Sequence, residues 1–390
     1  MTLVPERPPT VMISCGEPSG DLYAGALVRE LAGLAPGLHA FGLGGERLRS
    51  AGATLLADYH GLTVTGLVEV LRVLPRSWAT YRALVAEARN RRPDVLVVID
   101  FPDFHFRLAP AVRRLGVPVV YYIPPQLWAW RPGRLRVMRR WLDHTLVIFP
   151  FEPPIYEKAG IPVEFVGHPL VDLATAAESR RPFLERLGLA PDAPTVALLP
   201  GSRPNELREM LPGLVGAAKI IASRLPGSQF VVARAPGLRD GLFAPLTDAR
   251  GLRLLSVDGR TDDVLAAADV AITASGTATV QTAIHGTPMV VVYRLAPLTY
   301  RLFRPFVRVD AYAMVNLVAG RKVARELIQD DFTPDAVASE TLRLLTDREL
   351  AAEARRALGE VRERLGAGGA SRRAAEAVLR VAASGSASQR

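Results

Sequence analysis

Short apolar runs alternate along the chain with longer stretches in which apolar and polar positions follow a helical period. The runs are rich in β-branched residues and apolar at nearly every position: TVMIS, HAFGLGG, DVLVVID, VPVVYYI, HTLVIFP, VEFVG, TVALLP, SQFVVA, LRLLSV, DVAITAS and TPMVVVYR. Strands that are apolar on both faces are typical of parallel sheets covered by helices on both sides. The pattern therefore predicts an α/β fold of doubly wound parallel sheets.

A break between two such sheets is expected around residues 170 to 190, between the sixth and seventh runs. With 390 residues, 49% of them apolar, the chain is long enough for two full cores. We predict an N-terminal domain over 1–170 and a C-terminal domain over 186–350. Residues 351–390 are expected to form C-terminal helices interrupted by GAGG (366–369), with Ser371 as an N-cap and a frayed tail. The pattern leaves open whether these helices cross back to the N-terminal domain.

Two strand-to-helix turns of the C-terminal domain are rich in Gly, Ser and Thr. GSRPNE (201–206) follows TVALLP, and GTATVQTAIHGTP (276–288) follows DVAITAS. In doubly wound sheets, ligands bind beyond the carboxyl ends of the strands, where helix N-termini offer N–H groups. The two turns fit a diphosphate, and Arg203 would neutralise charge on a departing nucleoside diphosphate. The alternative is that Arg203 caps a surface helix and the glycines only close turns.

Carboxylates follow a buried strand of the N-terminal domain, in VLVVIDFPDFHF. Asp100 ends this strand, where partial desolvation would suit a general base that takes a proton from a hydroxyl. The alternative is that Asp100 or Asp103 caps the helix that begins near Phe104, and for Asp103 this capping role is the expected one. His105 is expected to be a packing or surface residue rather than a ligand. With six histidines and one cysteine in the chain, we expect no structural metal and no cofactor.

The turn ISCGEPSGDLYAG (13–25) looks like a nucleotide-binding loop but lacks the spacing of one. Gly16 and Gly20 are four residues apart, whereas the fingerprint GxGxxG has its first two glycines two apart. The GKS or GKT ending of a P-loop is also missing. The pattern excludes a standard nicotinamide or ATP loop.

Two further segments combine apolar and basic residues. YYIPPQLWAWRPGRLRVMRRW places Trp128 and Trp130 beside arginines, which suits a sugar and phosphate site or a membrane surface, and equally a core role for one tryptophan. In LTVTGLVEVLRVLPRSW (62–78) one helical face is apolar, and Pro75 is expected to end the helix. From its pattern alone this is a core helix rather than an acyl-chain contact.

The net charge of +9 indicates anionic partners, namely nucleic acid, acidic lipid or phosphorylated substrates, or else only a solvated basic surface. Cys15, the single cysteine, is expected to be a buried residue at a strand end, in agreement with a reducing compartment. The start MTLVPERPPT lacks the apolar region of a secretory peptide, and the longest uncharged run (117–130) is too short to span a bilayer. We therefore expect a cytoplasmic protein.

Together the motifs resemble one family closely, the lipid-A-disaccharide synthases, which are inverting glycosyltransferases of the GT-B fold. WAWR and the IDxPDF pattern are specific, whereas SGT and PGSR also occur in other nucleotide-sugar enzymes. The matching pieces run in the family's order: GEPSGD (16–21), GLVEVL (66–71), IDFPDF (99–104), WAWR (128–131), FVGHPL (165–170), LLPGSR (198–203), ASGTAT (274–279), PMVVVYR (288–294) and NLVAGR (316–321). The resemblance implies two doubly wound Rossmann-like domains that face a central cleft, followed by C-terminal helices.

The resemblance also implies a reaction. A UDP-2,3-diacylglucosamine donor would bind the C-terminal domain, and 2,3-diacylglucosamine 1-phosphate the N-terminal domain. The acceptor's 6-hydroxyl would attack the anomeric carbon in a single displacement, giving a β-linked disaccharide phosphate and UDP in lipid A biosynthesis. The enzyme would lie peripherally on the inner face of the cytoplasmic membrane, an anionic surface, and no nucleic-acid partner is expected.

By similarity, Asp100 would be the catalytic base and Arg203 the diphosphate contact. An enzyme that handles four acyl chains also needs an apolar surface, with arginines nearby for anionic headgroups. The donor site would comprise Gly201, Ser202, Arg203, Ser275, Gly276, Thr277, Gln281 and Asn316. The acceptor side would comprise Gly16, Glu17, Ser19, Gly20, Asp21, Trp128 and Arg131. Lipid would be met by Leu67, Val68, Val70, Leu71 and Leu74.

Three residues depart from the family's usual pattern. Gln281 stands where glutamate is usual, and an amide offers the ribose hydroxyls one acceptor oxygen and a weaker, uncharged bond. His105 replaces the usual asparagine, and Pro124 the usual serine. The alternatives are another GT-B UDP-sugar enzyme, such as a UDP-N-acetylglucosamine 2-epimerase or a different sugar-lipid transferase, and a non-catalytic relative that binds UDP-sugar or membrane. The presence of both Asp100 and Arg203 favours an enzyme.

Overall fold

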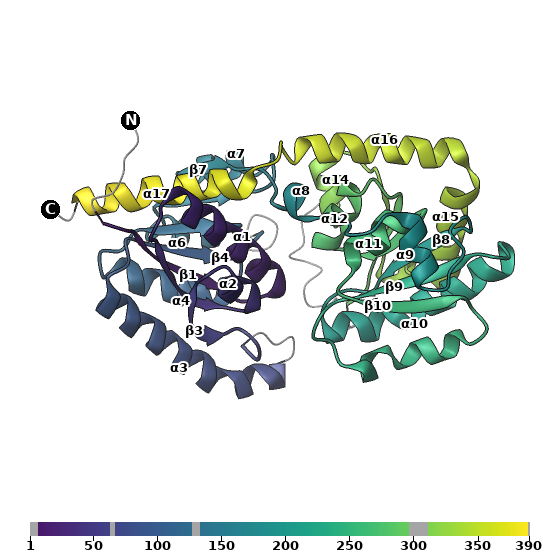
Figure 1. Ribbon diagram of the computed structural model, residues 1–390, viewed down its shortest axis with the longest axis horizontal. Coiled ribbons are helices and arrows are strands. Elements are labelled where there is room, and N and C mark those ends of the chain that lie inside the picture. Colours follow the sequence, from purple (N-terminus) through teal and green to yellow (C-terminus); the bar gives the residue numbers. More distant parts are fainter. Residues whose placement is uncertain (1–6, 63–66, 127–132, 296–310, 389–390) are drawn as a thin grey trace. The chain divides into compact units, whose positions relative to one another are not determined.

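The chain folds into two compact units, each built on one parallel sheet (Figure 1). One unit comprises Met1–Pro169 and Gly366–Arg390, and the other Leu170–Leu365. The structure, a computed structural model, describes residues 7–62, 67–126, 133–295 and 311–388, without the side chains of 67–73 and 386–388. The α/β class predicted from the apolar runs is confirmed.

The N-terminal unit contains a seven-stranded sheet in the order β3-β2-β1-β4-β5-β6-β7, with all strands parallel. Its strands are β1 (Thr10–Cys15), β2 (His39–Gly44), β3 (Thr54–Asp58), β4 (Val95–Ile99), β5 (Val119–Tyr122), β6 (His144–Val147) and β7 (Val163–Phe165). Every residue of β4 is buried, as expected for a central strand with helices on both faces.

Helices from both ends of the chain cover this sheet. On one face, α1 (Pro18–Leu34) lies beside α17 (Ala370–Ser388), the helix drawn in yellow in Figure 1. On the other face, α3 (Leu67–Arg91) and α4 (Pro102–Arg113) contribute buried apolar residues to a common core. Arg373 fastens α17 to the unit, because its Nε donates to the carbonyl oxygen of Val166 at 2.9 Å. The shorter helices are α2 (Glu46–Ser50), α6 (Gly133–Met138) and α7 (Pro153–Lys158).

The C-terminal unit contains a six-stranded parallel sheet in the order β10-β9-β8-β11-β12-β13. Its strands are β8 (Thr195–Leu199), β9 (Gln229–Arg234), β10 (Leu254–Asp258), β11 (Val270–Ala274), β12 (Met289–Tyr293) and β13 (Arg325–Ile328). Its α-helices are α8 (Leu170–Leu173), α9 (Arg180–Arg186), α10 (Pro204–Arg224), α11 (Thr261–Ala267), α12 (Thr277–Ile284), α14 (Met314–Ala319), α15 (Pro334–Thr346) and α16 (Arg348–Arg364). Among the residues of this unit that the structure describes, η1 (Asp240–Ala249) and η3 (Gln329–Asp331) are 3-10 segments.

Three predicted helix boundaries are wrong. Pro75 lies inside α3 rather than at its end; it is exposed, so water can satisfy the carbonyl group that loses its N–H partner. Asp103 is the second residue of α4, and Phe101 occupies the N-cap in a left-handed conformation. Ser371 likewise lies within α17, because Gly369, with φ of 84°, turns the chain into this helix two residues earlier than predicted.

Candidate active site

In each unit, predicted site residues follow the two strands at which the strand order reverses. β1 leads into Gly16 and β4 into Asp100, while β8 leads into Gly201 and β11 into Ser275. The place where the strand order reverses is called a switch point. Doubly wound folds bind their ligands there, beyond the carboxyl ends of the strands. The strand order therefore gives a reason, independent of any motif, to look for chemistry in these four turns.

Asp100 stands in an unusual backbone turn. Asp100 and Phe101 both adopt left-handed conformations, with φ of 50° and 49°, which cost a non-glycine residue about 1 kcal/mol or more. The Asp100 side chain is half-buried. Burial first, and then the negative charge of Asp100, raises the pKa of Tyr23 and of Tyr121. The carboxylate of Asp100 thus lies among aromatic side chains that stay protonated.

The glycine turn after β1 packs against the turn after β4. Gly16 is buried beneath the ring of Phe101, and a Cβ at Gly16 would overlap that ring. Gly20 lies against Cys15, where a Cβ would be 3.2 Å from the cysteine Cβ. Cys15 is buried at the end of β1, as predicted. Gly16 therefore allows close contact between the two turns, and Gly20 allows α1 to pack against the ends of β1 and β4.

Asp21 has a structural role in this unit. Its side chain is buried and accepts hydrogen bonds from the backbone N–H groups of Gly45 (2.7 Å), Arg47 (2.9 Å) and Leu48 (3.1 Å). These donors belong to the first turn of α2, which has no other side-chain cap. The carboxylate joins α1 to α2, and its position on the acceptor side stays a prediction.

Replacing Asp21 by alanine is expected to lower the free energy of unfolding of the N-terminal unit by about 3 kcal/mol, because buried N–H donors lose a charged acceptor. Tryptophan fluorescence during urea unfolding measures this directly, since all four tryptophans lie in residues 78–141. Glu46→Ala is the control: this side chain, on α2, the helix that Asp21 caps, is 74% exposed, and a change below about 0.5 kcal/mol is expected. Equal losses in the two variants would contradict the role of Asp21.

Only some of the remaining residues predicted for the acceptor side and for lipid contact lie within the described part of the chain. Glu17 and Ser19 are half-buried where α1 begins. Leu74 is 43% exposed on α3. Trp128 and Arg131 lie outside the described residues, as do the side chains of Leu67, Val68, Val70 and Leu71.

The turn after β8 holds Arg203 beside a carboxylate. Gly201 has φ of 110°, and a Cβ there would overlap the Glu206 side chain. Glu206 accepts from the backbone N–H groups of Ser202 (2.9 Å) and Arg203 (3.3 Å). The Arg203 guanidinium donates to the same carboxylate at 3.1 Å and keeps 45% of its side chain exposed. Arg203 thus occupies the N-cap position of α10, as the capping alternative expects, and still presents its cation to solvent.

The turn after β11 opens α12. Gly276 occupies the N-cap, and Thr277 is exposed at the first helical position. The Ser275 hydroxyl donates to the carbonyl oxygen of Tyr312 at 2.9 Å, so this side chain ties the turn to the segment before α14. Because β8 and β11 are neighbours in the sheet, the turns at 201–203 and 275–277 lie beside each other at the carboxyl ends of these strands, at the switch point.

Gln281 lies one turn further along α12 and is held by Asp262. Its Nε2 donates to Asp262 Oδ1 at 2.7 Å, and His285 Nε2 contacts the same oxygen at 2.8 Å. A carboxylate only accepts hydrogen bonds, so the amide must turn its nitrogen toward Asp262. The contact fixes which end of the Gln281 amide points away from Asp262.

Asn316 uses its amide within the protein. The side chain is buried; Nδ2 donates to the Ala324 carbonyl oxygen (2.9 Å) and to Glu326 (2.7 Å), while Oδ1 accepts from the N–H groups of Val323 (2.8 Å) and Ala324 (2.9 Å). These four bonds occupy the full hydrogen-bonding capacity of an amide. Asn316 joins α14 to β13, and a direct contact with a donor stays a prediction.

Sequence reasoning missed the carboxylates that orient these groups. Glu206 was detectable, because a glutamate three residues after an N-cap is the signature of a capping box. Asp262 and Glu326 lie 19 and 10 residues from the amides they hold, and no local pattern connects them.

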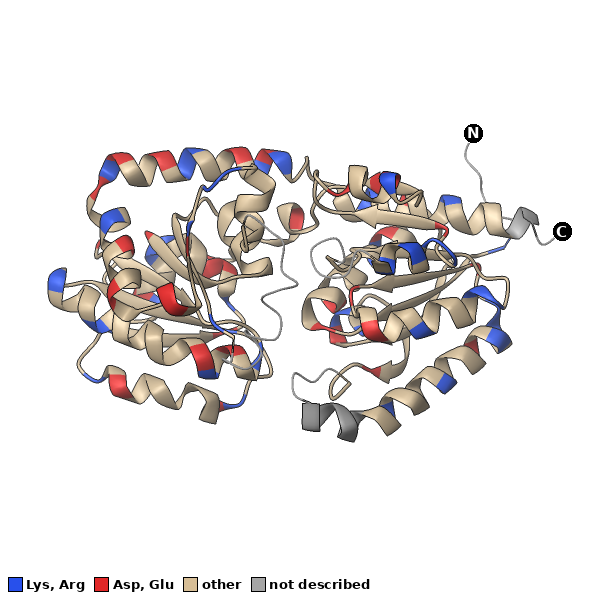
Figure 2. Cartoon of the chain, turned by 180° about the vertical axis from the view of Figure 1, so that it is seen from behind, with Lys and Arg blue, Asp and Glu red and all other residues tan. Residues whose placement is uncertain are grey.

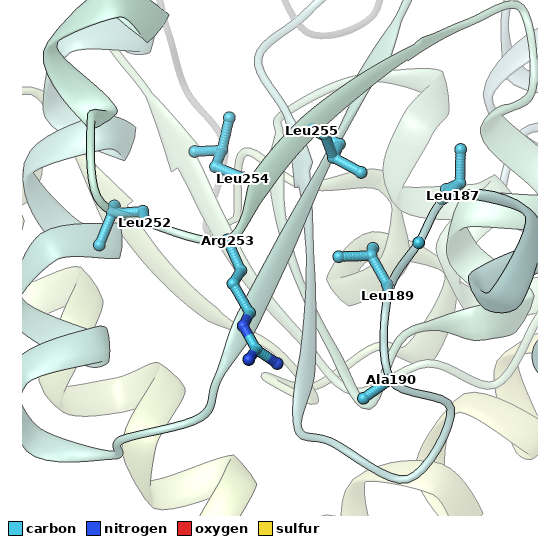
Figure 3. Close-up of a pocket in the computed structure, with 8 residues that line it drawn as sticks. Leu187, Leu189, Ala190, Leu252, Arg253, Leu254 and Leu255 are labelled. Atoms are coloured by element: carbon cyan, nitrogen blue, oxygen red, sulfur yellow. The ribbon is translucent and has the colours of Figure 1, made fainter.

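A separate hollow of about 540 Å³ lies in the C-terminal unit (Figure 3). It is lined by Leu187, Gly188, Leu189, Ala190, Leu252, Arg253, Leu254 and Leu255. The last of these residues begin β10, the edge strand, so the hollow lies at the amino end of a strand and away from the switch point. In the part of the chain that the structure describes, no group of three or more His, Cys, Asp or Glu side chains is arranged to hold a metal ion.

Comparison with known proteins gives close relatives in sequence and more distant ones in structure. A family model described as lipid-A-disaccharide synthetase matches residues 11–381. The lipid-A-disaccharide synthase of Geobacter sulfurreducens is 44% identical over 372 residues, 95% of this chain and 96% of the relative. The UDP-GlcNAc 2-epimerase of Neisseria meningitidis, solved with UDP-GlcNAc, has a TM-score of 0.68 at 13% identity, covering 95% of this chain and 100% of its own. The calicheamicin glycosyltransferase CalG4 has a TM-score of 0.60 at 17% identity, covering 96% and 98%. These two structures bear on the fold alone, and the predicted GT-B class is confirmed.

Proposed function

Because this chain belongs to the lipid-A-disaccharide synthase family, we propose that it transfers diacylglucosamine from UDP-2,3-diacylglucosamine to 2,3-diacylglucosamine 1-phosphate. It is a glycosyltransferase of lipid A biosynthesis that uses a UDP-sugar donor and a sugar-phosphate acceptor. The observation that carries the proposal is the family match over residues 11–381, which includes all four turns at the two switch points.

Asp100 serves as the general base in the proposed reaction. Its carboxylate takes the proton of the acceptor's 6-hydroxyl while the oxygen forms a bond to the anomeric carbon of the donor. The bond from that carbon to the diphosphate breaks, and UDP leaves with the electron pair. Support comes from the half-buried position of Asp100 at the end of a fully buried strand, beside the switch point at which doubly wound folds bind their ligands.

Arg203 and the first turns of α10 and α12 hold the diphosphate of the donor in this proposal. An exposed guanidinium at a helix N-terminus is suited to a diphosphate, because cation and helix dipole both favour negative charge there. As UDP departs, the charge on its β-phosphate grows, and the attraction of Arg203 grows with it. Gln281, with its amide nitrogen on Asp262, turns its oxygen to accept from a ribose hydroxyl.

An assay in detergent micelles tests the reaction. With both substrates, mass spectrometry is expected to show a disaccharide phosphate and an equal amount of UDP. Donor alone and acceptor alone are expected to remain unchanged. Conversion of the donor alone into a second UDP-sugar would instead support an epimerase, and binding of UDP with no turnover over several acyl lengths would support a non-catalytic relative.

The enzyme is proposed to work in the cytoplasm, bound peripherally to the inner face of the cytoplasmic membrane. In the described chain no helix has the length and apolar character needed to cross a bilayer. On α3, Leu74 and Trp78 are 43% and 57% exposed and lie one helical turn apart. Arginines follow them on the same helix, among them the exposed Arg82 and Arg89 (Figure 2). Exposed tryptophan next to arginine suits the boundary between acyl chains and anionic headgroups.

Replacing Trp78 by serine is expected to weaken binding to vesicles that contain anionic lipid about tenfold, because the buried apolar area at the membrane surface decreases. Vesicle co-sedimentation gives the binding constant. Leu255→Ser is the control, since Leu255 is a 38% exposed apolar side chain of the C-terminal unit and should leave binding unchanged. Unaltered binding by the Trp78 variant, or an equal loss in both, would contradict a membrane contact at α3.

A further inference from the structure

The left-handed turn at Asp100 needs partners that hold it, because two consecutive non-glycine residues with positive φ are strained. The carbonyl oxygen of Asp100 accepts two hydrogen bonds, from His105 Nδ1 at 2.6 Å and from the Tyr121 hydroxyl at 2.7 Å. The Asp100 N–H donates to the carbonyl oxygen of Ile123 at 3.2 Å. Both ends of the Asp100 peptide are thus fixed by neighbouring elements.

In its contact with the Asp100 carbonyl oxygen, the Nδ1 atom of His105 must be the hydrogen-bond donor. A carbonyl oxygen only accepts, so the proton of the ring lies on Nδ1, and Nε2 accepts from the Ser14 hydroxyl at 2.8 Å. His105 is fully buried, and burial lowers its pKa to about 3. The imidazole therefore stays neutral near neutral pH and keeps this one tautomer.

Neighbouring groups also fix the orientation of the ring. Phe101 and Tyr121 meet it nearly edge-on, with centroids 5.7 Å and 6.0 Å away. Ser14 belongs to β1 and is fully buried. A chain of contacts thus runs from β1 through Ser14 and His105 to the backbone of Asp100, which links the two strands at the switch point.

We propose that His105 is a positioning residue that sets the direction of the Asp100 side chain by donating from Nδ1 to the Asp100 carbonyl oxygen, with Ser14 holding the ring. The inference rests on the proposed role of Asp100 as the base. Without the Nδ1 donor, the turn can relax toward ordinary backbone angles, and the carboxylate leaves its position beside the acceptor hydroxyl. Proton transfer requires hydrogen-bond distance, so the effect is expected in kcat and not in KM.

Two amide variants separate positioning from packing. In His105→Asn the amide nitrogen can occupy the place of Nδ1 and donate to Asp100. In His105→Gln the longer chain carries its amide to the place of Nε2, so the contact with Ser14 is kept and the donor to Asp100 is lost. We expect the glutamine variant to lose about 30-fold in kcat with KM within about threefold, and the asparagine variant to stay within about fivefold of the parent enzyme.

A double-mutant cycle links the effect to Asp100. In an Asp100→Asn background, His105→Gln is expected to cause less than about a twofold further loss, because two residues that act as a unit are not additive. Equal kcat losses in the asparagine and glutamine variants, or an undiminished glutamine effect without the Asp100 carboxylate, would overturn the proposal.

A readout without catalysis keeps this inference separate from the proposed function. Nitrogen-15 shifts of the His105 ring are expected to show a neutral Nδ1–H imidazole from pH 5 to 8. The amide signal of Phe101, the next peptide group, is expected to move in the glutamine variant and much less in the asparagine variant. The opposite tautomer, or equal movements, would overturn the inference even in an active enzyme. A parent enzyme that forms no disaccharide would refute the proposed function while these signals still report on the turn.

Discussion

Replacing Asp100 by asparagine is expected to lower kcat about 10³-fold, since a general base typically contributes 10²- to 10⁴-fold. Asparagine suits this test because, like aspartate, it tolerates the left-handed conformation that residue 100 adopts, with φ of 50°. The substitution therefore removes the negative charge and leaves the turn in place. KM for both substrates is expected to stay within about threefold. Initial rates at saturating donor and acceptor give the two constants.

Asp103→Asn is the matched control. Asp103 lies three residues further on, its side chain is 82% exposed, and it pairs with Arg134 at 3.0 Å. An exposed ion pair contributes little, so kcat is expected to stay within about twofold. A folded Asp100 variant with parent activity would refute the role of the base, and equal losses in the two variants would show that Asp100 has no special position.

Replacing Arg203 by alanine is expected to lower kcat by about 10²- to 10³-fold, the usual cost of removing a group that stabilises charge in the transition state. The charge on the leaving UDP is greatest after the glycosidic bond has weakened, so kcat should fall more than affinity for the donor. Lysine at this position should recover part of the loss, because it keeps the charge without the bidentate geometry. Steady-state kinetics and calorimetric titration with UDP provide the two readouts.

Arg208→Ala is the control for the Arg203 variant. Arg208 lies on the same helix, is exposed, and donates to Asn205 at 2.9 Å. Its loss should leave kcat within about twofold. If Arg203 acts only as a cap together with Glu206, its alanine variant will melt at a lower temperature and keep its kcat, which would contradict the proposed role.

Most of the fold could be predicted from the sequence, because buried parallel strands produce continuous apolar runs. Among the strands that the structure describes, β3 and β13 were missed, and both lie at the edges of their sheets. β3, with the sequence TLLAD, is only half-buried, and β13 is a run of four residues, Arg325–Ile328, that begins with two charges. Strands of this kind form because they pair with a neighbouring strand. That neighbour is distant in the sequence, so the local pattern of residues does not indicate the strand.

The positions of the candidate site residues could be predicted better than the contacts that these residues make. The rule that ligands bind beyond the carboxyl ends of parallel strands pointed to the turns at residues 201 and 275, and Asp100 was selected because it ends a buried strand. The strand order of the structure then places these turns, and the turn at Gly16, at the switch points of the two sheets. Asp21 and Asn316 lie in motifs of the family, yet they hold backbone N–H groups of their own unit. A motif indicates that a side chain is required. Only its contacts in the structure show whether it stabilises the fold or binds the ligand.

The proposed reaction is a single displacement that joins the anomeric carbon of the donor to the 6-oxygen of the acceptor with inversion. NMR of the purified product tests it most directly. The expected result is a correlation between the new anomeric proton and carbon 6 of the second sugar, together with the large coupling between that proton and the proton on carbon 2 that a β-linkage gives. An α-linkage, attachment at another hydroxyl, or release of UDP without a disaccharide would contradict it.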